Sequence, residues 1–382
     1  MIVAVNTRFL LSGELEGYGY FIKEAFSAIA KQHPQHQFYF LFDRPYSNDF
    51  VFGNNVTPIV ISPPARHSLL WKFWYDVRVP LVLKKIKADV FVSPDGFCSL
   101  TTKVPQCLVA HDLAFLHFPQ SIPKTQLFFY KRYTPKFLHK AKSIATVSQF
   151  SKKDIVEQYK IDEAKIGVVY SAAKQIFQPL SFDDQTTIKE KYTNGKEYFL
   201  YTGAIHPRKN LINLLKAFSI FKKRQQSGMK LVLAGRLAWK NNEFLTLLKT
   251  YKYRTDVLLT GYLPEAELAR LTASAYALIY PSLFEGFGVP VLEAMQCGVP
   301  VLTSGNTSMQ EIGEDAALYF DANDCTDIAE KLMLIYKDET LRNNLIKKGF
   351  VIAKKYSWQQ TADLLWANIV KAVNENETKK NK

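Results

Sequence analysis

Short β-rich runs alternate with longer helical patterns along the whole chain, and this alternation restricts the fold more than any other feature. The β-rich runs lie at 2–6, 38–42, 88–93, 106–111 and 143–148 in the first half, and at 198–203, 230–235, 257–262, 277–282 and 299–304 in the second. Patterns typical of helices fill gaps between them, at about 18–32, 69–87, 123–140 and 149–159 in the first half and near 210–226, 241–252, 264–274, 289–297 and 324–337 in the second. Strands that alternate with helices predict βαβ units, in which the strands form parallel sheets.

The length of 382 residues predicts two domains, because single cores rarely grow beyond about 250–300 residues. The polar stretch 178–185, QPLSFDDQ, has no clear period, and we interpret it as a linker. We therefore expect an α/β protein with a Rossmann-like N-terminal domain over 1–178, a Rossmann-like C-terminal domain over 186–356, and a last helix over 357–373. Doubly wound sheets bind ligands at the carboxyl ends of their strands, so two facing sheets would enclose a cleft.

Composition argues against a membrane-spanning protein and against a disulfide-rich one. No stretch approaches the roughly 18–20 apolar residues of a membrane span. The start, MIVAVNTRFLLSG, lacks a basic region, and we interpret it as a first strand and not as a secretion signal. The four cysteines have no CxxC spacing and no histidines at metal-ligand intervals, so we expect small buried side chains in a reducing cytoplasm.

The net charge of +14 is distributed unevenly along the chain. Residues 1–180 hold 22 Lys and Arg against 13 Asp and Glu, a net of +9, and residues 181–382 hold 27 against 22, a net of +5. A basic first half is typical of proteins that bind nucleic acid, an anionic membrane surface or a negatively charged substrate. No RNA- or DNA-binding signature accompanies the charge.

Two glycines, Gly17 and Gly19 in LEGYGYFIKEAF, open a helix soon after the first strand. Glycines at such a place let the backbone approach a ligand and present helix-terminal N–H groups to an anion. The dinucleotide fingerprint GxGxxG is incomplete, because Ile22 stands where the third glycine belongs. A phosphate-contacting loop and a plain flexible loop both fit these residues, and a dehydrogenase does not.

His111 ends a β-rich run in VAHDLAF, and Asp112 follows it. A single histidine at the end of a buried strand is more often a hydrogen-bonded structural group than a catalyst. The residues alone therefore favour a structural role for His111.

The segment TGAIHPRKNL places Gly203 at a strand end and Arg208 and Lys209 just before the next helix. Adjacent cations at a helix start are unfavourable beside the helix dipole unless an anion lies between them. Arginine offers a planar fork of donors and lysine a point charge, and together they suit a diphosphate. The alternative is a solvated basic turn.

The segment FEGFGVPVLEAMQCGVP, residues 284–300, is the most specific signal in the chain. Glu285 lies in a loop after a buried strand, and a Gly-Phe-Gly turn follows. Pro290 then stands in the first turn of a helix, where its missing N–H costs least. The free N–H groups of that helix can face a phosphate, and Glu293 can accept hydrogen bonds from a pair of ligand hydroxyls. For Glu293 the alternative is a favourable interaction with the helix dipole in the first turn.

Glu285 and Glu293 form an E-x7-E pattern that resembles the retaining, GT-B-fold glycosyltransferases of group 1, or family 4. The similarity continues through 297–330, covers nearly the whole chain, and is strongest from about 198 to 360. The other motifs fall in the order expected for the family, namely the Gly17–Gly19 loop, His111 with Asp112, and PRKN at 207–210.

The resemblance implies a role for each motif. Arg208 and Lys209 would hold the diphosphate of a nucleoside-diphosphate sugar, and Glu293 would bind its ribose hydroxyls. Glu285 would contact the transferred sugar, and His111 would reach across the cleft to a sugar hydroxyl. The remaining donor contacts would be the glycines Gly17, Gly19 and Gly203, Tyr262 and Leu263 at the base, and Gly286, Phe287, Gly288 and Val289 beside Glu285.

The resemblance also implies chemistry without a metal or a cofactor, because paired cations and helix N-termini stabilise the charge of the departing nucleoside diphosphate. The sequence has no convincing DxD motif, and Asp321 and Asp324 are spaced D-x-x-D. Retention of anomeric configuration follows from the resemblance alone. Two residues depart from the pattern: Ala204 and Tyr20 stand where relatives often have an arginine.

The acceptor is expected on the more basic first domain. The stretches 69–87 and 124–142 mix aromatic residues with lysines and arginines. A basic, aromatic helix can lie on an anionic bilayer. We therefore hypothesise a cytoplasmic enzyme, peripheral on the inner membrane face, that extends a glycan or lipid-linked acceptor in cell-surface polysaccharide synthesis. The alternative for these stretches is a core helix with a solvated polar face.

The sequence thus predicts a retaining hexosyltransferase, and it leaves the donor base (UDP, GDP or ADP), the sugar and the acceptor open. A sugar-nucleotide epimerase of the same fold is the first alternative, and a basic nucleic-acid-binding protein is the second. An epimerase would make a new sugar nucleotide without acceptor, whereas a transferase would give at most slow hydrolysis of the donor.

Overall fold

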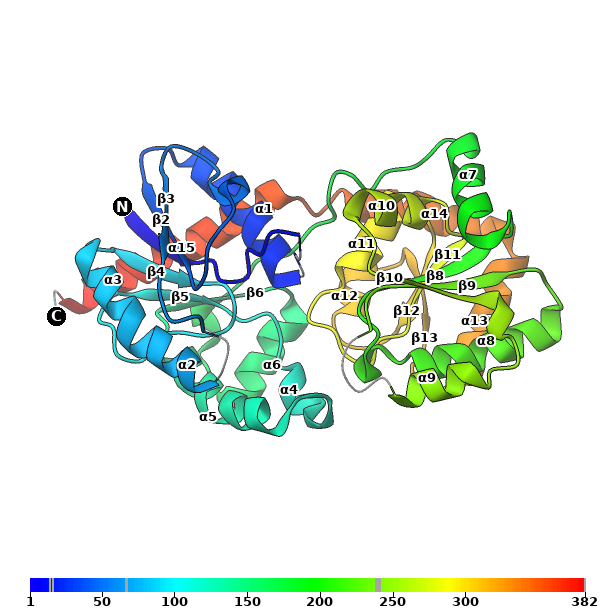
Figure 1. Cartoon of the computed structure of the whole chain (residues 1–382), viewed down its shortest axis with the longest axis horizontal. Coiled ribbons are helices and arrows are strands. Elements are labelled where there is room, and N and C mark those ends of the chain that lie inside the picture. The colour runs from blue at the N-terminus through cyan, green and yellow to red at the C-terminus, as the bar shows by residue number, and fades with distance from the viewer. Residues whose placement is uncertain (14, 16, 66–67, 238–241, 381–382) are drawn as a thin grey trace. The chain divides into compact units, whose positions relative to one another are not determined.

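The structure is a computed structural model, and it describes residues 1–13, 15, 17–65, 68–237 and 242–380. The chain divides into two compact units, each with its own sheet (Figure 1). Unit 1 comprises Met1–Ser171 and Ser357–Lys382, and unit 2 comprises Ala172–Tyr356.

Unit 1 is built on a parallel sheet in the order β3-β2-β1-β4-β5-β6-β7. Its strands are β1 (Ile2–Asn6), β2 (Gln37–Phe42), β3 (Val56–Val60), β4 (Val90–Ser93), β5 (Gln106–Val109), β6 (Ser143–Thr146) and β7 (Ile166–Val168). Its helices are α1 (Gly17–Gln32), α2 (Ser68–Phe73), a π-helical turn (Trp74–Arg78), α3 (Val79–Lys85), α4 (Ala114–His117), α5 (Lys124–Lys140), α6 (Gln149–Tyr159) and α15 (Trp358–Lys380). The strand order reverses between β1 and β4, which is where sheets of this type bind ligands.

Unit 2 is built on a second parallel sheet in the order β10-β9-β8-β11-β12-β13. Its strands are β8 (Tyr198–Thr202), β9 (Lys230–Ala234), β10 (Val257–Gly261), β11 (Ala277–Tyr280), β12 (Val301–Ser304) and β13 (Ala317–Phe320). Its helices are α7 (Phe182–Thr193), a 3-10 turn (Pro207–Lys209), α8 (Leu211–Gln225), α9 (Asn242–Lys249), α10 (Glu265–Ala273), α11 (Val289–Gln296), α12 (Met309–Gly313), α13 (Cys325–Lys337) and α14 (Glu339–Ala353). Here the order reverses between β8 and β11.

The central strands are continuous apolar runs because helices cover both faces of a parallel sheet. Every residue of β8 and of β11 is buried, and these are the runs YFLYT and ALIY. The predicted pair of parallel α/β sheets is therefore confirmed. Among the described residues, no helix is both long and apolar enough to cross a bilayer.

Three strands were not predicted from the sequence, and all three lie at a sheet edge. They are β3, β7 and β13. An edge strand is covered on fewer sides, so its side chains are partly exposed and its apolar run is short. Only the first residue of β3 is buried, for example. The remaining edge strand, β10, was predicted because its residues are mostly apolar.

The predicted linker at 178–185 is wrong in its second half, where α7 begins at Phe182. The Ser181 hydroxyl accepts a hydrogen bond from the Asp184 amide at 3.2 Å, which is the cap that starts a helix. The spacing Ser-x-x-Asp is a helix-start signal, from which the start of α7 could have been predicted.

The last helix, α15, is part of unit 1, where it packs against α1 and β6. The Ser143 hydroxyl donates to the carbonyl of Asn368 at 2.7 Å, and the Trp366 ring stacks on the His33 ring at 4.0 Å. The helix was expected to end at residue 373, and it continues to Lys380.

Candidate active site

The carboxyl edge of the unit 2 sheet brings Arg208, Lys209 and Glu285 together. The Lys209 ammonium contacts Oε1 of Glu285 in a close ion pair, and Nη1 of Arg208 lies 3.4 Å from Oε2. The side chain of Arg208 is only 20% exposed, that of Lys209 13% and that of Glu285 10%. The alternative interpretation, a solvated basic turn, is therefore wrong. In this structure the carboxylate of Glu285 contacts both cations, and the diphosphate stays a prediction.

Asn210 fixes the turn that carries the two cations. Its backbone is left-handed, with φ of 63°, a conformation that asparagine tolerates better than most residues. Its side-chain amide donates to the carbonyls of Pro281 at 3.1 Å and Ala322 at 2.6 Å. The backbone carbonyl of Arg208 also accepts from the Leu283 amide at 2.9 Å. The cationic turn and the loop of Glu285 are thus hydrogen-bonded to each other directly.

Glu285 is ionised at neutral pH. Burial opposes ionisation, but the charges of Lys209 and Arg208 outweigh it and lower the pKa of Glu285 to about 2. Tyr280 extends the group, because its hydroxyl accepts from the Lys209 ammonium at 2.9 Å. A carboxylate with this pKa can stabilise positive charge or orient a hydroxyl, but it holds no proton to donate.

Two hydroxyl residues hold the loop of Glu285, and the sequence analysis assigned them no role. The Ser308 hydroxyl lies 2.9 Å from the carbonyls of both Glu285 and Phe287, to which it donates. The Glu285 amide donates to Oγ1 of Thr307 at 3.4 Å. Thr307 has φ of 54°, an outlier for a β-branched residue. The only available signal was the polar run GNTS directly after a buried strand.

Glu293 lies on α11, whose start is set by Gly288 with φ of 107°. The first turn of α11 holds no acidic residue, so the proposed dipole interaction of Glu293 is wrong. Glu293 is 8% exposed, and no hydrogen bond reaches its carboxyl group from the described residues. Its pKa is raised to about 7, mainly by burial; Lys174 opposes the shift and Glu265 adds to it. The carboxyl group is thus poised to gain or lose a proton near neutral pH.

The other predicted donor contacts in unit 2 lie at the same sheet edge or on the loop of Glu285. Gly203 follows β8 with φ of 134°, a conformation that favours glycine. Tyr262 and Leu263 follow β10, and the Tyr262 ring is 55% exposed. Phe287 is buried with its ring edge-on to that of Tyr356 at 5.8 Å. The turn residues Gly286, Gly288 and Val289 flank it at the start of α11.

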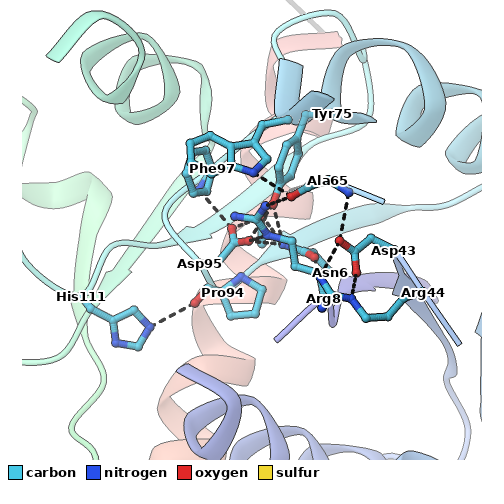
Figure 2. Close-up of polar contacts among 12 residues, drawn as sticks. Asn6, Arg8, Asp43, Arg44, Ala65, Tyr75, Pro94, Asp95, Phe97 and His111 are labelled. Carbon is cyan, nitrogen blue, oxygen red and sulfur yellow. Dashed lines mark hydrogen bonds and ion pairs between the residues drawn. The ribbon is translucent and has the colours of Figure 1, made fainter. Parts of the chain in front are cut away.

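The remaining predicted residues lie in unit 1. His111 follows β5, and its Nε2 lies 3.0 Å from the carbonyl oxygen of Pro94 (Figure 2). This hydrogen bond agrees with the structural role that the residues alone favoured. Gly17 and Gly19 are in the first turn of α1, and a Cβ at Gly19 would meet the Phe9 carbonyl oxygen at 2.6 Å. Gly19 is therefore required by packing, whereas Gly17 faces open space.

The described residues contain no group of three or more His, Cys, Asp and Glu side chains placed to hold a metal ion. Asp321 and Asp324, which are spaced D-x-x-D, have local partners. Asp324 caps α13 by accepting from the Thr326 amide at 2.7 Å, and Asp321 accepts from the Asn323 amide at 2.9 Å.

Comparison with known proteins identifies the family of the chain. The model of the family described as glycosyl transferases group 1 matches residues 184–351, and that of Glycosyltransferase Family 4 matches residues 20–173. The chain belongs to the group 1 glycosyltransferases, and it is an enzyme of that class with two Rossmann-like domains of the GT-B type.

Curated relatives include O-antigen mannosyltransferases. The chain is 32% identical to O-antigen chain mannosyltransferase B of Escherichia coli over 250 residues, 65% of this chain and 66% of that protein. It is 31% identical to the serotype-specific mannosyltransferase WbdA of Escherichia coli over 62% of this chain. The chain thus spans just under two thirds of the first relative and 29% of the second.

Solved structures share the fold at low sequence identity. Sucrose-phosphate synthase of Thermosynechococcus elongatus superposes with a TM-score of 0.77 at 15% identity, covering 96% of this chain and 97% of that one. Anabaena Alr3699/HepE in complex with UDP-glucose gives 0.73 at 15% identity, covering 97% and 99%.

Proposed function

We propose that this protein is a retaining, metal-independent hexosyltransferase that uses a nucleoside-diphosphate sugar in the synthesis of a cell-surface polysaccharide. The observation that carries the proposal is the buried group of Arg208, Lys209 and Glu285 at the carboxyl edge of the unit 2 sheet. Two cations and one anion give this group a net charge of +1. It therefore attracts a diphosphate, while Glu285 keeps the cations in place before the donor binds.

The chemistry follows from the charges. When the glycosidic bond of the donor breaks, negative charge grows on the diphosphate and positive charge grows on the sugar. Arg208 and Lys209 stabilise the diphosphate, and charge-assisted hydrogen bonds in a buried site are stronger than in water. Glu285, with a pKa of about 2, is an anion throughout and stabilises the sugar cation. The side chains that stabilise the transition state are thus charged and placed before the donor arrives.

Glu293 binds the donor ribose in this proposal. A carboxylate accepts two hydrogen bonds from a vicinal diol, and the carboxyl group of Glu293 has no other partner among the described residues. Tyr262 and Leu263 contact the base. His111 contacts a hydroxyl of the transferred sugar, and the backbone at Gly17 and Gly19 contacts the donor phosphates.

The relatives favour mannose as the transferred sugar, because several of them are named mannosyltransferases. A thermal-shift screen with UDP-, GDP- and ADP-sugars tests the donor. A ligand at about 100 times its Kd adds roughly 2.7 kcal/mol to the free energy of unfolding. One base is expected to stabilise the protein, and transfer to an acceptor glycan is expected with that mannosyl donor. A new sugar nucleotide formed without acceptor would instead indicate an epimerase.

We further propose that unit 1 binds the anionic inner face of the cytoplasmic membrane, where a lipid-linked acceptor resides. The two basic, aromatic stretches form neighbouring helices. The Trp71 ring of α2 packs on the Phe129 ring of α5 at 5.2 Å, and the ammonium groups of Lys72 and Lys136 both lie within 5.5 Å of the Tyr133 ring.

These helices expose apolar side chains beside cations. Phe128 is 66% exposed on α5, where Lys131 and Arg132 are also exposed. Phe73, Val77 and Leu81 recur every fourth residue along α2, the π-helical turn and α3, and all three are exposed. The remaining aromatic residues of α5 turn inward, and Phe129 is buried. Part of each stretch is therefore core, as the alternative interpretation held, and the outward face suits a bilayer interface.

Vesicle co-sedimentation tests the membrane proposal. Binding is expected to vesicles that contain anionic lipid and not to neutral ones. The double variant Lys131→Glu/Arg132→Glu is expected to weaken binding at least 30-fold, because each cation contributes about 1 kcal/mol. The matched control, Lys216→Glu/Lys223→Glu on α8 of unit 2, changes the net charge equally and is expected to bind normally. Equal binding of neutral and anionic vesicles would exclude the proposal.

A further inference from the structure

A buried charged cluster lies at the carboxyl ends of β1 and β4, where the strand order of unit 1 reverses (Figure 2). We call Asn6, Arg8, Tyr75 and Asp95 the Arg8–Asp95 cluster. Arg8 is 6% exposed, and its Nε lies 2.5 Å from Oδ2 of Asp95, whose side chain is fully buried. Burying an ion pair costs free energy of solvation, so its presence at a ligand-binding position calls for an explanation.

The carboxylate of Asp95 is saturated with donors. The Asn6 side-chain amide and the Tyr75 hydroxyl each donate to Oδ2 at 2.7 Å, alongside Arg8. The other oxygen, Oδ1, accepts from the Phe97 amide and the Ser93 hydroxyl, both at 3.2 Å. Because every lone pair is engaged, Asp95 cannot serve as a base. The network instead holds the backbone at Asp95 in one position.

The Arg8 guanidinium is fixed as firmly as the carboxylate. It lies 4.8 Å from the centre of the Phe97 ring, 4.9 Å from Phe9 and 5.6 Å from Tyr75. Burial raises the pKa of Tyr75 well above its usual value, so its hydroxyl stays protonated and remains a donor. The hydrogen bonds and ring contacts therefore hold the guanidinium and the carboxylate together.

The backbone that Asp95 holds in place contacts His111. The peptide between Pro94 and Asp95 supplies the carbonyl oxygen that lies 3.0 Å from Nε2 of His111. A carbonyl only accepts, so Nε2 carries the proton and the lone pair of neutral His111 is on Nδ1. The rings of Tyr18 at 4.6 Å and Phe21 at 5.0 Å flank the imidazole. Burial lowers the pKa of His111, although the Pro94 carbonyl and the charges of Asp112 and Asp95 oppose the shift.

We propose that the Arg8–Asp95 cluster is a positioning device that sets the tautomer of His111, so that Nδ1 accepts a hydrogen bond from a substrate hydroxyl. The substrate part of this inference rests on the proposed function, and the tautomer part does not. Asp95 is thus a positioning residue, since it acts through the Pro94 carbonyl and has no free lone pair for substrate.

The tautomer is measured by ¹⁵N NMR of protein labelled at histidine, without any substrate. The chain has seven histidines, and His111→Gln identifies the signal. The wild-type protein is expected to show Nε2 protonated. Asp95→Asn is expected to give a mixture of tautomers at His111, and Tyr75→Phe, which removes one donor and keeps the ring, is expected to give a smaller change in the same direction. A wild-type His111 protonated on Nδ1 would overturn the inference.

Kinetics supply the second readout. Asp95→Asn is expected to lower kcat by about 100-fold while the donor KM changes little, because a misplaced contact at the reacting centre acts on the transition state. The matched control is Asp256→Asn in unit 2, a partly buried carboxylate that pairs with Lys230 at 2.6 Å. Asp256 has no part in the Arg8–Asp95 cluster, and its variant is expected to retain the His111 tautomer.

The outcomes of these experiments distinguish the proposed function from the positioning role of the Arg8–Asp95 cluster. The predicted tautomer in a protein that transfers no sugar would reject the proposed function and keep the positioning inference. An unchanged tautomer in both Asp95→Asn and Tyr75→Phe would reject the inference, even with transfer intact. If Asp95→Asn does not fold, Tyr75→Phe alone decides between these results.

Discussion

Glu285 and Glu293 are eight positions apart and have identical side chains, but their surroundings give them very different pKa values. Glu285 has a pKa of about 2 and Glu293 a pKa of about 7, and both are buried. The difference is that Lys209 and Arg208 face the first, whereas burial without a bonded cation dominates at the second. Pairs of carboxyl groups with pKa values driven apart are typical of catalytic sites.

The pKa of Glu293 predicts how stability depends on pH. A carboxyl group with a raised folded-state pKa resists ionisation, so the wild-type protein loses free energy of unfolding as pH rises from about 4.5 to about 7. Glu293→Gln removes this loss. Urea denaturation is expected to show the variant more stable than wild type by up to about 3 kcal/mol at pH 8, with the difference vanishing near pH 4.5. A difference that is constant with pH would contradict the assignment.

The ion pair of Lys209 and Glu285 predicts non-additive variants. Lys209→Met leaves a buried carboxylate with only Arg208, and such a loss typically costs about 3–5 kcal/mol. Lys209→Met/Glu285→Gln removes the charge as well and is expected to recover at least half of the lost stability. Guanidinium denaturation of both single variants and the double variant measures the coupling. Strictly additive costs would show that the two side chains do not interact.

At the scale of elements, the loop between β11 and α11 depends on Ser308, which follows β12 and whose hydroxyl clamps the loop by hydrogen bonds. Ser308→Ala is expected to lower the free energy of unfolding by about 1–3 kcal/mol, because two carbonyls lose their donor. The turnover rate is expected to fall as well, because Glu285 is no longer held. Ser143→Ala in unit 1 is the matched control, since its buried hydroxyl also donates to a carbonyl. Equal losses of turnover in the two variants would rule out a specific clamp.

Much of the fold and part of the site were predictable at this scale. The central strands were found because burial on both faces forces an apolar run, and the motifs with Arg208 and Glu285 were found because charge is rare beside such runs. The edge strands β3, β7 and β13 were missed, since partial exposure shortens the apolar run. Ser308 and Thr307 were missed because a hydroxyl that clamps a distant backbone leaves no local pattern.

The same limit applies to the Arg8–Asp95 cluster. Arg8 and Asp95 are 87 positions apart and become neighbours only when β1 and β4 pair. Nothing in the sequence around either residue indicates the ion pair. For His111 the residues favoured a hydrogen-bonded group, which the structure confirms, but its partner is a backbone carbonyl that no sequence motif marks.

At the scale of the whole molecule, each unit has its own parallel sheet, and the predicted donor residues are mostly in unit 2. Hydrogen exchange with the nucleoside diphosphate alone is therefore expected to slow at the strand ends and loops near 203–210 and 285–293. The core strands of unit 1, such as β2, are expected to exchange at an unchanged rate. Protection confined to unit 1 would place the nucleotide elsewhere.

In the proposed function, Arg208 and Lys209 bind the donor diphosphate. The decisive test of this role is the ratio of two affinities, that of a nucleoside diphosphate and that of its parent nucleoside. Titration calorimetry measures both ligands on the wild-type protein and on Arg208→Met/Lys209→Met/Glu285→Gln, in which no charge is left unpaired. The ratio is expected to be large in the wild type and to fall close to one in the variant, with nucleoside affinity preserved. A variant that folds and keeps the wild-type ratio would contradict the account.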